Sequence, residues 1–210
     1  YGGNVRYENS NFSVGITALS YSFGKYRIQP DPKPYNLFYF RGNDNINMSV
    51  NYMLKTKKVK FYGETAISSN KAVATLNAFQ LTPVSYLSLL HRYYDRRYQA
   101  FFGNAFGQNS SVQNEQGVYA GMQWTPFAHF KLSMYADVFR FPWLKYGVDA
   151  PSSGQEYMVQ LDADPGKNFA WYLRYKYRKK EKNRTLENES TLNILPYSQQ
   201  RFRLQFLYGI

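Results

Sequence analysis

Strict alternation of apolar and polar residues marks the stretch HFKLSMYADVFRF, residues 129 to 141. One parity is wholly apolar and holds Phe130, Leu132, Met134, Ala136 and Val138. The other parity carries the cation Lys131 and the anion Asp137. Because successive side chains of a strand point to opposite faces, this stretch predicts a β-strand with one apolar face and one charged face.

The same alternation recurs along the chain and predicts about eleven strands. It is clearest in the segments near 12–18, 46–54, 59–67, 118–124, 157–163, 169–177 and 202–210. The pattern blurs at 71–82 and 84–95, where apolar residues fall on both parities. Many strands are close to the roughly 9 to 11 residues that cross a bilayer at a tilt.

The expected connections are of two lengths, and every long one falls at one end of the strands together with the short SSNK, whereas four short turns fall at the other. Short turns are expected at KTKK, TPV, TPFA and DPGK. Long loops are expected at 24–44, 96–114, 142–153 and 180–198. Barrels of the outer membrane have short turns on the periplasmic side and long loops outside, whereas a Greek-key sandwich has no reason to separate them.

The predicted fold is therefore an all-β antiparallel transmembrane barrel of the bacterial outer membrane, forming one domain over 1–210. An odd strand count is unusual for single-chain bacterial barrels, so we expect this chain to form part of a larger barrel. The alternative is a soluble, aromatic-rich β-sheet protein that binds carbohydrate and packs the same apolar parity inward.

Composition adds few constraints. No apolar run approaches the roughly 20 residues of a membrane helix. The chain has no cysteine, which excludes disulfides and thiolate chemistry. Its formal net charge of +12 would attract nucleic acid, anionic lipid or acidic glycan.

The parities assign the side chains of the expected barrel to lipid or to lumen. The residues expected to face lipid are Phe130, Leu132, Met134, Val138, Phe169, Trp171 and Leu173. The charged residues expected to face the lumen are Lys131, Asp137, Asp162, Asp164, Arg174, Lys176, Arg178, Arg201 and Arg203.

Four segments carry a resemblance to a known family. They are RGNDNINMSVNYML, HRYYDRRYQAFFGNAFGQNSSVQNEQGVYAGMQWTPF, FRFPWLKYGVDAPSSG and YLRYKYRKKEKN. Over most of residues 11–210 the sequence resembles the C-terminal barrel region of Bacteroidota outer-membrane proteins described as helix-hairpin-helix domain-containing proteins. In that family a small DNA-contacting module precedes the barrel, and the resemblance implies the same location and fold here.

Few residues have a pattern that indicates catalysis. Asp162 and Asp164 form a D-x-D pair that would suit general-base chemistry, but a lumen ion pair with Arg174 or Lys176 is the simpler interpretation. His91 and the second histidine, His129, have no partner at metal-ligand spacing, and we expect His91 to lie in a Tyr and Arg network. A lipase-type Ser and His pair is left open, since no serine stands out.

We expect no enzymatic activity, no cofactor and no bound metal. The expected function is a porin-like pore for transport, passive or gated, or an anchoring subunit of an outer-membrane assembly. The clusters HRYYDRRY and YLRYKYRKKEKNR leave DNA capture or uptake as an alternative, because charge and aromatic stacking bind nucleic acid. The expected partners are outer-membrane lipid, lipopolysaccharide and other outer-membrane subunits, with nucleic acid as the alternative partner.

Overall fold

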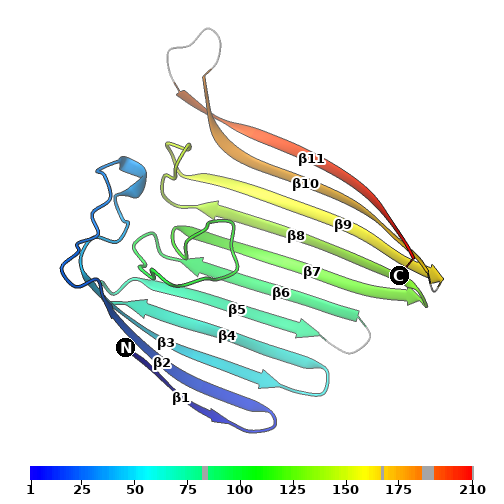
Figure 1. Ribbon diagram of the computed structural model, residues 1–210, viewed down its shortest axis with the longest axis horizontal. Helices are drawn as coiled ribbons and strands as arrows, with labels where there is room; N and C mark the ends of the chain where they lie inside the picture. Colours follow the sequence, from blue (N-terminus) through cyan, green and yellow to red (C-terminus); the bar gives the residue numbers. More distant parts are fainter. Residues whose placement is uncertain (82–84, 167, 186–191, 210) are drawn as a thin grey trace.

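The fold was determined as a computed structural model, which describes residues 1–81, 85–166, 168–185 and 192–209. The described residues form one antiparallel sheet of eleven strands, in which each strand pairs with its neighbours in chain order (Figure 1). The strands are β1 (Gly2–Glu8), β2 (Phe12–Ser22), β3 (Asp44–Lys55), β4 (Val59–Ser68), β5 (Val73–Leu81), β6 (Ser85–Tyr94), β7 (Glu115–Phe127), β8 (Phe130–Phe141), β9 (Ser152–Gly166), β10 (Phe169–Thr185) and β11 (Leu192–Tyr208). The expectation of an all-β antiparallel fold is confirmed.

One end of the sheet carries the long connections, and we call it the loop end. Residues 23–43, which include the short 3-10 helix η1 (Pro34–Asn36), join β2 to β3 there. The segments 95–114 and 142–151 join the later strands at the same end. The opposite end, called the turn end, carries short turns such as 56–58 and 128–129. The expected turn TPV, residues 82–84, lies outside the described residues.

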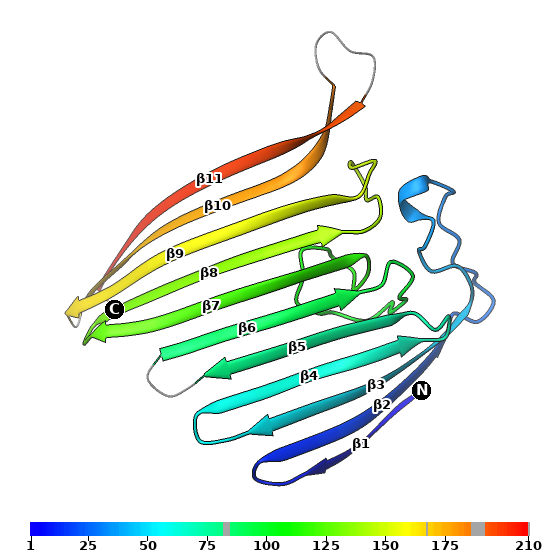
Figure 2. The same ribbon diagram turned by 180° about the vertical axis from the view of Figure 1, so that it is seen from behind.

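The expected long loop at 180–198 is wrong over most of its length. Strands β10 and β11 pair without a break from Phe169 opposite Tyr208 to Thr185 opposite Leu192. The charged run RKKEKN shows no apolar alternation, and the sequence therefore predicted a loop there. Backbone pairing needs no apolar face, and the hairpin extends beyond the rest of the sheet (Figures 1 and 2). Residues 186–191 of this expected loop lie outside the described residues.

Register divides the side chains into two faces, because directly opposite residues of paired strands lie on the same face. Met134 lies opposite Met122 and Val159, whereas Asp137 lies opposite Tyr119 and Glu156. The segment 95–114, called the inner loop, folds back against the face that holds Asp137 (Figure 1). We call this the inner face and the opposite one the outer face.

The outer face is apolar and uncovered across the whole sheet. Every strand contributes at least one large exposed apolar side chain to it, namely Val5, Ile16, Val50, Ile67, Phe79, Leu89, Val118, Val138, Val159, Tyr175 and Phe206. Ile16 and Phe206, near the two edges, are each 61% exposed, and Val118 in the centre is 45% exposed. Within the described residues, the sheet therefore has no second layer over this face.

The buried apolar cluster lies on the inner face instead. It consists of Ala72, Ala74, Tyr94 and Tyr98, with Val112 of the inner loop packed against it. No helix within the described residues is long and apolar enough to span a bilayer. The sheet is open, with β1 and β11 as its two edges.

Candidate functional site on the inner face

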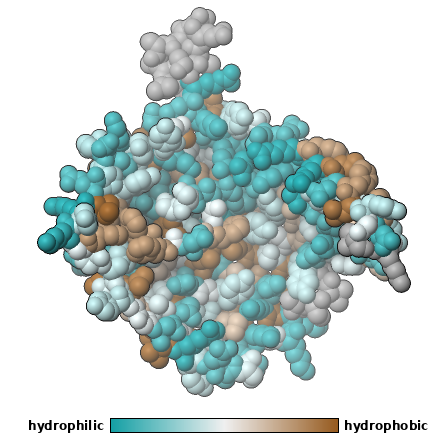
Figure 3. All heavy atoms as spheres, viewed as in Figure 1, coloured by the Kyte–Doolittle hydropathy of each residue, from teal (hydrophilic) through white to brown (hydrophobic). Residues whose placement is uncertain are grey.

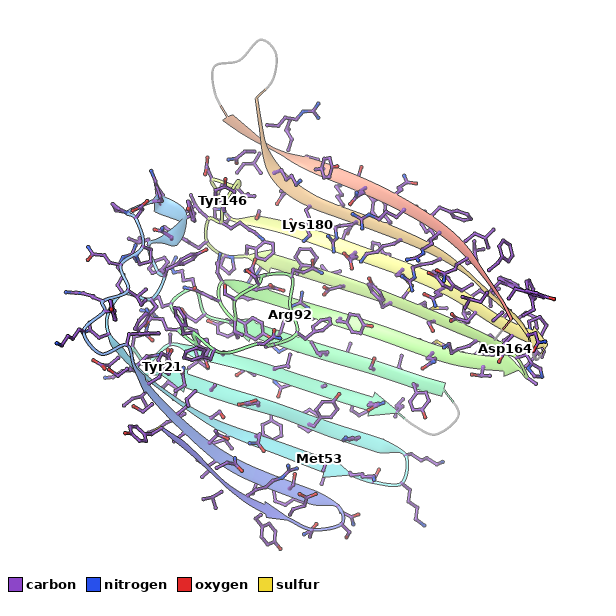
Figure 4. The ribbon with its side chains drawn as sticks, in the orientation of Figure 1. Tyr21, Met53, Arg92, Tyr146, Asp164 and Lys180 are labelled. Carbon is purple, nitrogen blue, oxygen red and sulfur yellow. The ribbon has the colours of Figure 1, made fainter. Side chains whose placement is uncertain are left out.

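A buried charge cluster lies under the inner loop at the centre of the sheet. It consists of Arg92 on β6, Glu115 at the start of β7 and Asp137 on β8. Arg92 donates from Nε to Glu115 at 2.7 Å and from its two terminal nitrogens to Asp137 at 2.8 and 3.2 Å. The three side chains are at most 2% exposed. Figure 4 shows Arg92 in the middle of the inner face.

The inner loop supplies the remaining donors to the two carboxylates. The backbone N–H groups of Gln108 and Asn109 donate to Glu115 at 2.8 to 2.9 Å. The side-chain amide of Gln108 donates to Asp137 at 2.9 Å. Because a buried carboxylate without donors is costly, these bonds fasten the loop to the sheet.

Glycine makes the space that Arg92 needs. Gly117 is the direct partner of Arg92 on β7, and a Cβ atom there would lie 2.7 Å from the guanidinium carbon. The rings of Phe106 and Phe139 cover the guanidinium at 5.4 and 5.9 Å from its carbon. Water is therefore excluded from the cluster, which strengthens its ion pairs.

A second network continues across the inner face from β8 to β10. Glu156 on β9 accepts hydrogen bonds from Tyr135 at 2.6 Å and from Arg178, and it pairs with Lys176 at 2.8 Å. Its carboxylate is thus shared by two cations. Glu156 is therefore the centre of this network.

Beyond this network the inner face becomes strongly basic. Arg174 lies directly opposite Arg203, and Lys176 lies directly opposite Arg201. We call these four residues the basic strip. Like charges directly opposite each other on a sheet are destabilising, so anions are expected to gather there. Figure 3 shows hydrophilic residues over much of this side of the molecule, with hydrophobic residues between them.

Apart from Asp164, which has no paired residue on a neighbouring strand, the residues that the sequence assigned to the lumen lie on the inner face by register, and those assigned to lipid lie on the outer face. Whether these faces meet lumen and lipid stays a prediction.

The expected partners of the aspartate pair are wrong. Asp162 lies 3.8 Å from Lys131 on the preceding strand and accepts from Gln160, while Arg174 donates to Gln160 instead. Asp164 lies 3.5 Å from His129 at the turn end, far from Arg92 in Figure 4. The two carboxylates therefore have different partners, Lys131 and His129, although both line one pocket at the turn end.

His91 also departs from its expected surroundings. It is exposed on the outer face, directly opposite Asn77 and Val118, whereas its neighbour Arg92 points to the inner face. The sequence held one signal for this difference: His91 and Arg92 are adjacent in a strand, so their side chains point to opposite faces. Among the described residues, no three acidic or histidine side chains converge to hold a metal ion.

No family model, curated protein or solved structure matches this chain. The resemblance to the helix-hairpin-helix outer-membrane proteins therefore stays a prediction, and the function must be argued from the two faces of the sheet.

Proposed function

We propose that this sheet is the wall of a membrane-spanning β-barrel of the bacterial outer membrane, whose inner face lines an aqueous pore that favours anions. The observation that supports this most directly is the contrast between its faces. All eleven strands carry exposed apolar side chains on one face, and strands β6 to β10 carry two charged networks on the other. Soluble monomers rarely expose apolar patches larger than a few hundred Å².

The polar side chains of the outer face support a lipid contact. Asn77 lies on this face, and Tyr52 donates its hydroxyl hydrogen to the Asn77 side-chain oxygen. Gly63 lies between them, where a Cβ atom would be 2.6 Å from that oxygen. A polar group that faces lipid is costly unless it is hydrogen-bonded, so this arrangement lowers the cost of Asn77.

A sheet that spans a lipid bilayer must also close into a barrel, because its edge strands cannot hydrogen-bond to water there. Unpaired backbone groups at β1 and β11 would each cost several kcal/mol in the hydrocarbon region. In the proposed barrel the two edges therefore pair with further strands, from the same polypeptide or from another subunit.

The charges of the inner face give the proposed pore its preference. The basic strip and Arg178 bring five cations to the neighbouring strands β10 and β11. Glu156 forms ion pairs with two of them, Lys176 and Arg178. Rings or strips of Arg and Lys select anions by electrostatic attraction. The inner loop, fastened at Arg92, narrows the path along the central strands.

Planar-bilayer recording tests this function. We expect the reconstituted protein to conduct current. Under a salt gradient, its reversal potential should lie toward the equilibrium potential of the anion. Arg174→Gln combined with Arg203→Gln should move the reversal potential toward zero, because it removes the directly opposed pair. Lys58→Gln, in a turn outside the strands, removes the same kind of charge and should leave selectivity unchanged. Cation-selective current, or equal effects of Lys58 and the arginine pair, would contradict the proposal.

An anchoring role is the second candidate, and the position of the inner loop favours it. This loop contacts residues from β2 to β8, including Tyr21, Asn45 and Asp137. If the protein inserts into the bilayer but passes no current, the inner loop closes the path and anchoring is the better account.

A further inference from the structure

The three long loops enclose a pocket at the loop end. Segment 23–43 contributes Tyr35 and Phe38, the inner loop contributes Arg96, and segment 142–151 contributes Trp143 and Tyr146. We call this the loop pocket. Its volume is about 150 Å³. This is below the roughly 300–1,000 Å³ of sites that enclose whole drug-sized ligands, so it suits one ring-sized unit.

Buried amides hold the three loops together around the pocket. Gln113 donates to the backbone oxygens of Phe38 and Arg96. Asn114 donates to the Trp143 oxygen at 2.9 Å, and its own side-chain oxygen accepts the Trp143 backbone N–H at 2.8 Å. Asn114 has a φ of 54°, a left-handed conformation that asparagine tolerates better than most residues.

The Trp143 indole N–H adds a further tie, donating to the Pro34 oxygen at 3.0 Å. Each loop is thus bonded to another within the pocket wall. A ligand entering a wall that is already ordered loses little free energy to ordering it.

Arg96 is held in a position suited to an anion. Its guanidinium carbon lies 4.8 Å from the centre of the Phe38 ring and 5.1 Å from that of Trp143. None of the described carboxylates forms an ion pair with it. Arginine binds carboxylate and phosphate groups through two parallel N–H donors, and contact with aromatic rings orients the planar group.

The remaining lining is aromatic and neutral-polar. Tyr35 stacks edge-on against Tyr146 at 5.7 Å, and Tyr146 is 83% exposed at the rim. Ser110 and Ser111 place exposed side chains in the wall, and Lys145 adds a second cation. Figure 4 shows Tyr146 at the loop end, beside Lys180.

We propose that the loop pocket binds an acidic saccharide, a sugar ring that carries a carboxylate. The aromatic rings suit the apolar face of a sugar, and the serine hydroxyls and amides suit its hydroxyl groups. The Arg96 guanidinium binds the carboxylate of the sugar. Single-stranded nucleic acid is less suited, because its recognition uses a basic groove that follows several phosphates, whereas this wall supplies only Arg96 and Lys145.

Calorimetric titration of the full chain in detergent tests the inference, which holds whether or not the sheet forms a pore. The probes are trigalacturonate, the neutral maltotriose and a six-residue oligothymidylate. We expect saturable binding of trigalacturonate. Arg96→Gln should weaken it by at least about tenfold, since hydrogen bonds to charged groups contribute roughly 1.5–3 kcal/mol.

Arg97→Gln is the matched control, because Arg97 is the next residue and its side chain pairs with Asp95 outside the pocket wall. It should leave the affinity within about twofold. If Arg96→Gln loosens the loops, detected as faster trypsin cleavage, Tyr146→Ala decides, since the exposed ring of Tyr146 forms no hydrogen bond with the described residues. We expect Tyr146→Ala to weaken binding several-fold.

Three results would overturn the inference. They are equal affinity of the Arg96→Gln and Arg97→Gln proteins, affinity for maltotriose equal to that for trigalacturonate, and an unchanged affinity in Tyr146→Ala. Tighter binding of the oligothymidylate than of trigalacturonate would assign the pocket to nucleic acid instead.

Discussion

Replacing Arg92 by methionine should detach the inner loop from the sheet. The substitution keeps an unbranched side chain of similar length but removes the only cation that contacts Glu115 and Asp137 among the described residues. Glu115 retains three hydrogen bonds from the backbone of the inner loop, whereas Asp137 retains only the amide of Gln108. The cost therefore falls chiefly on Asp137.

The magnitude follows from burial. Removing one partner of a buried ion pair costs about 3–5 kcal/mol, because it leaves an uncompensated charge. Asp137 is 2% exposed, so solvent relieves little of this cost while the loop stays docked. Undocking lets water reach the carboxylate, and the closed loop should lose roughly two to three and a half powers of ten in population at 1.4 kcal/mol per factor of ten.

Hydrogen exchange at the backbone amides of Gln108 and Asn109 measures this opening. We expect exchange to accelerate by at least about a hundredfold in Arg92→Met and to slow again when Asp137→Asn is added. Arg140→Met is the control, since Arg140 is exposed. Among the described residues its side chain donates a hydrogen bond only to Gln116. Exchange in Arg92→Met as slow as in the unmodified protein would refute the reasoning.

Two further predictions concern the faces and the loop pocket. Leu132→Arg should lower the free energy of unfolding in lipid by about 2–4 kcal/mol while Ser133→Arg costs little, and equal effects in denaturant titrations would contradict the assignment of the faces. Burial, and then the charge of Lys180, lower the pKa of Lys145 to about 8, against the opposing attraction of Glu115. The cation is present below that pH and lost above it, so trigalacturonate affinity should fall between pH 7 and 9, and a Lys145→Gln protein should show no such fall.

The sequence was sufficient for the two faces and for three of the four expected long loops, but not for the segment 180–198. Alternation around Leu132 and Lys131 assigned each residue to a face, because the period of a strand is two whatever the tertiary structure. The prediction for 180–198 was wrong because the end of β10, which includes Lys180 and Lys182, pairs as a strand although its own sequence has no apolar alternation.

The charge cluster was not predictable from local pattern. Arg92 and Glu115 are separated in the sequence by the inner loop, and they meet because β6 and β7 pair in a register that places them two residues apart on one face, where the loop then covers them. The aspartate pair shows the same limit, because cross-strand register decides whether Asp162 meets Lys131 or Arg174. Register and loop docking are set by contacts distant in the sequence, which periodicity does not report.

Site-directed fluorescence in lipid vesicles tests the membrane-spanning sheet most directly. The chain contains no cysteine, so Val159→Cys and Gln160→Cys each give one labelling site, on adjacent residues of β9 with opposite faces. We expect a fluorophore at 159 to be quenched by lipid-attached nitroxide and not by aqueous iodide, and one at 160 to show the reverse. Quenching of both labels by iodide, with neither affected by the lipid nitroxide, would contradict the account.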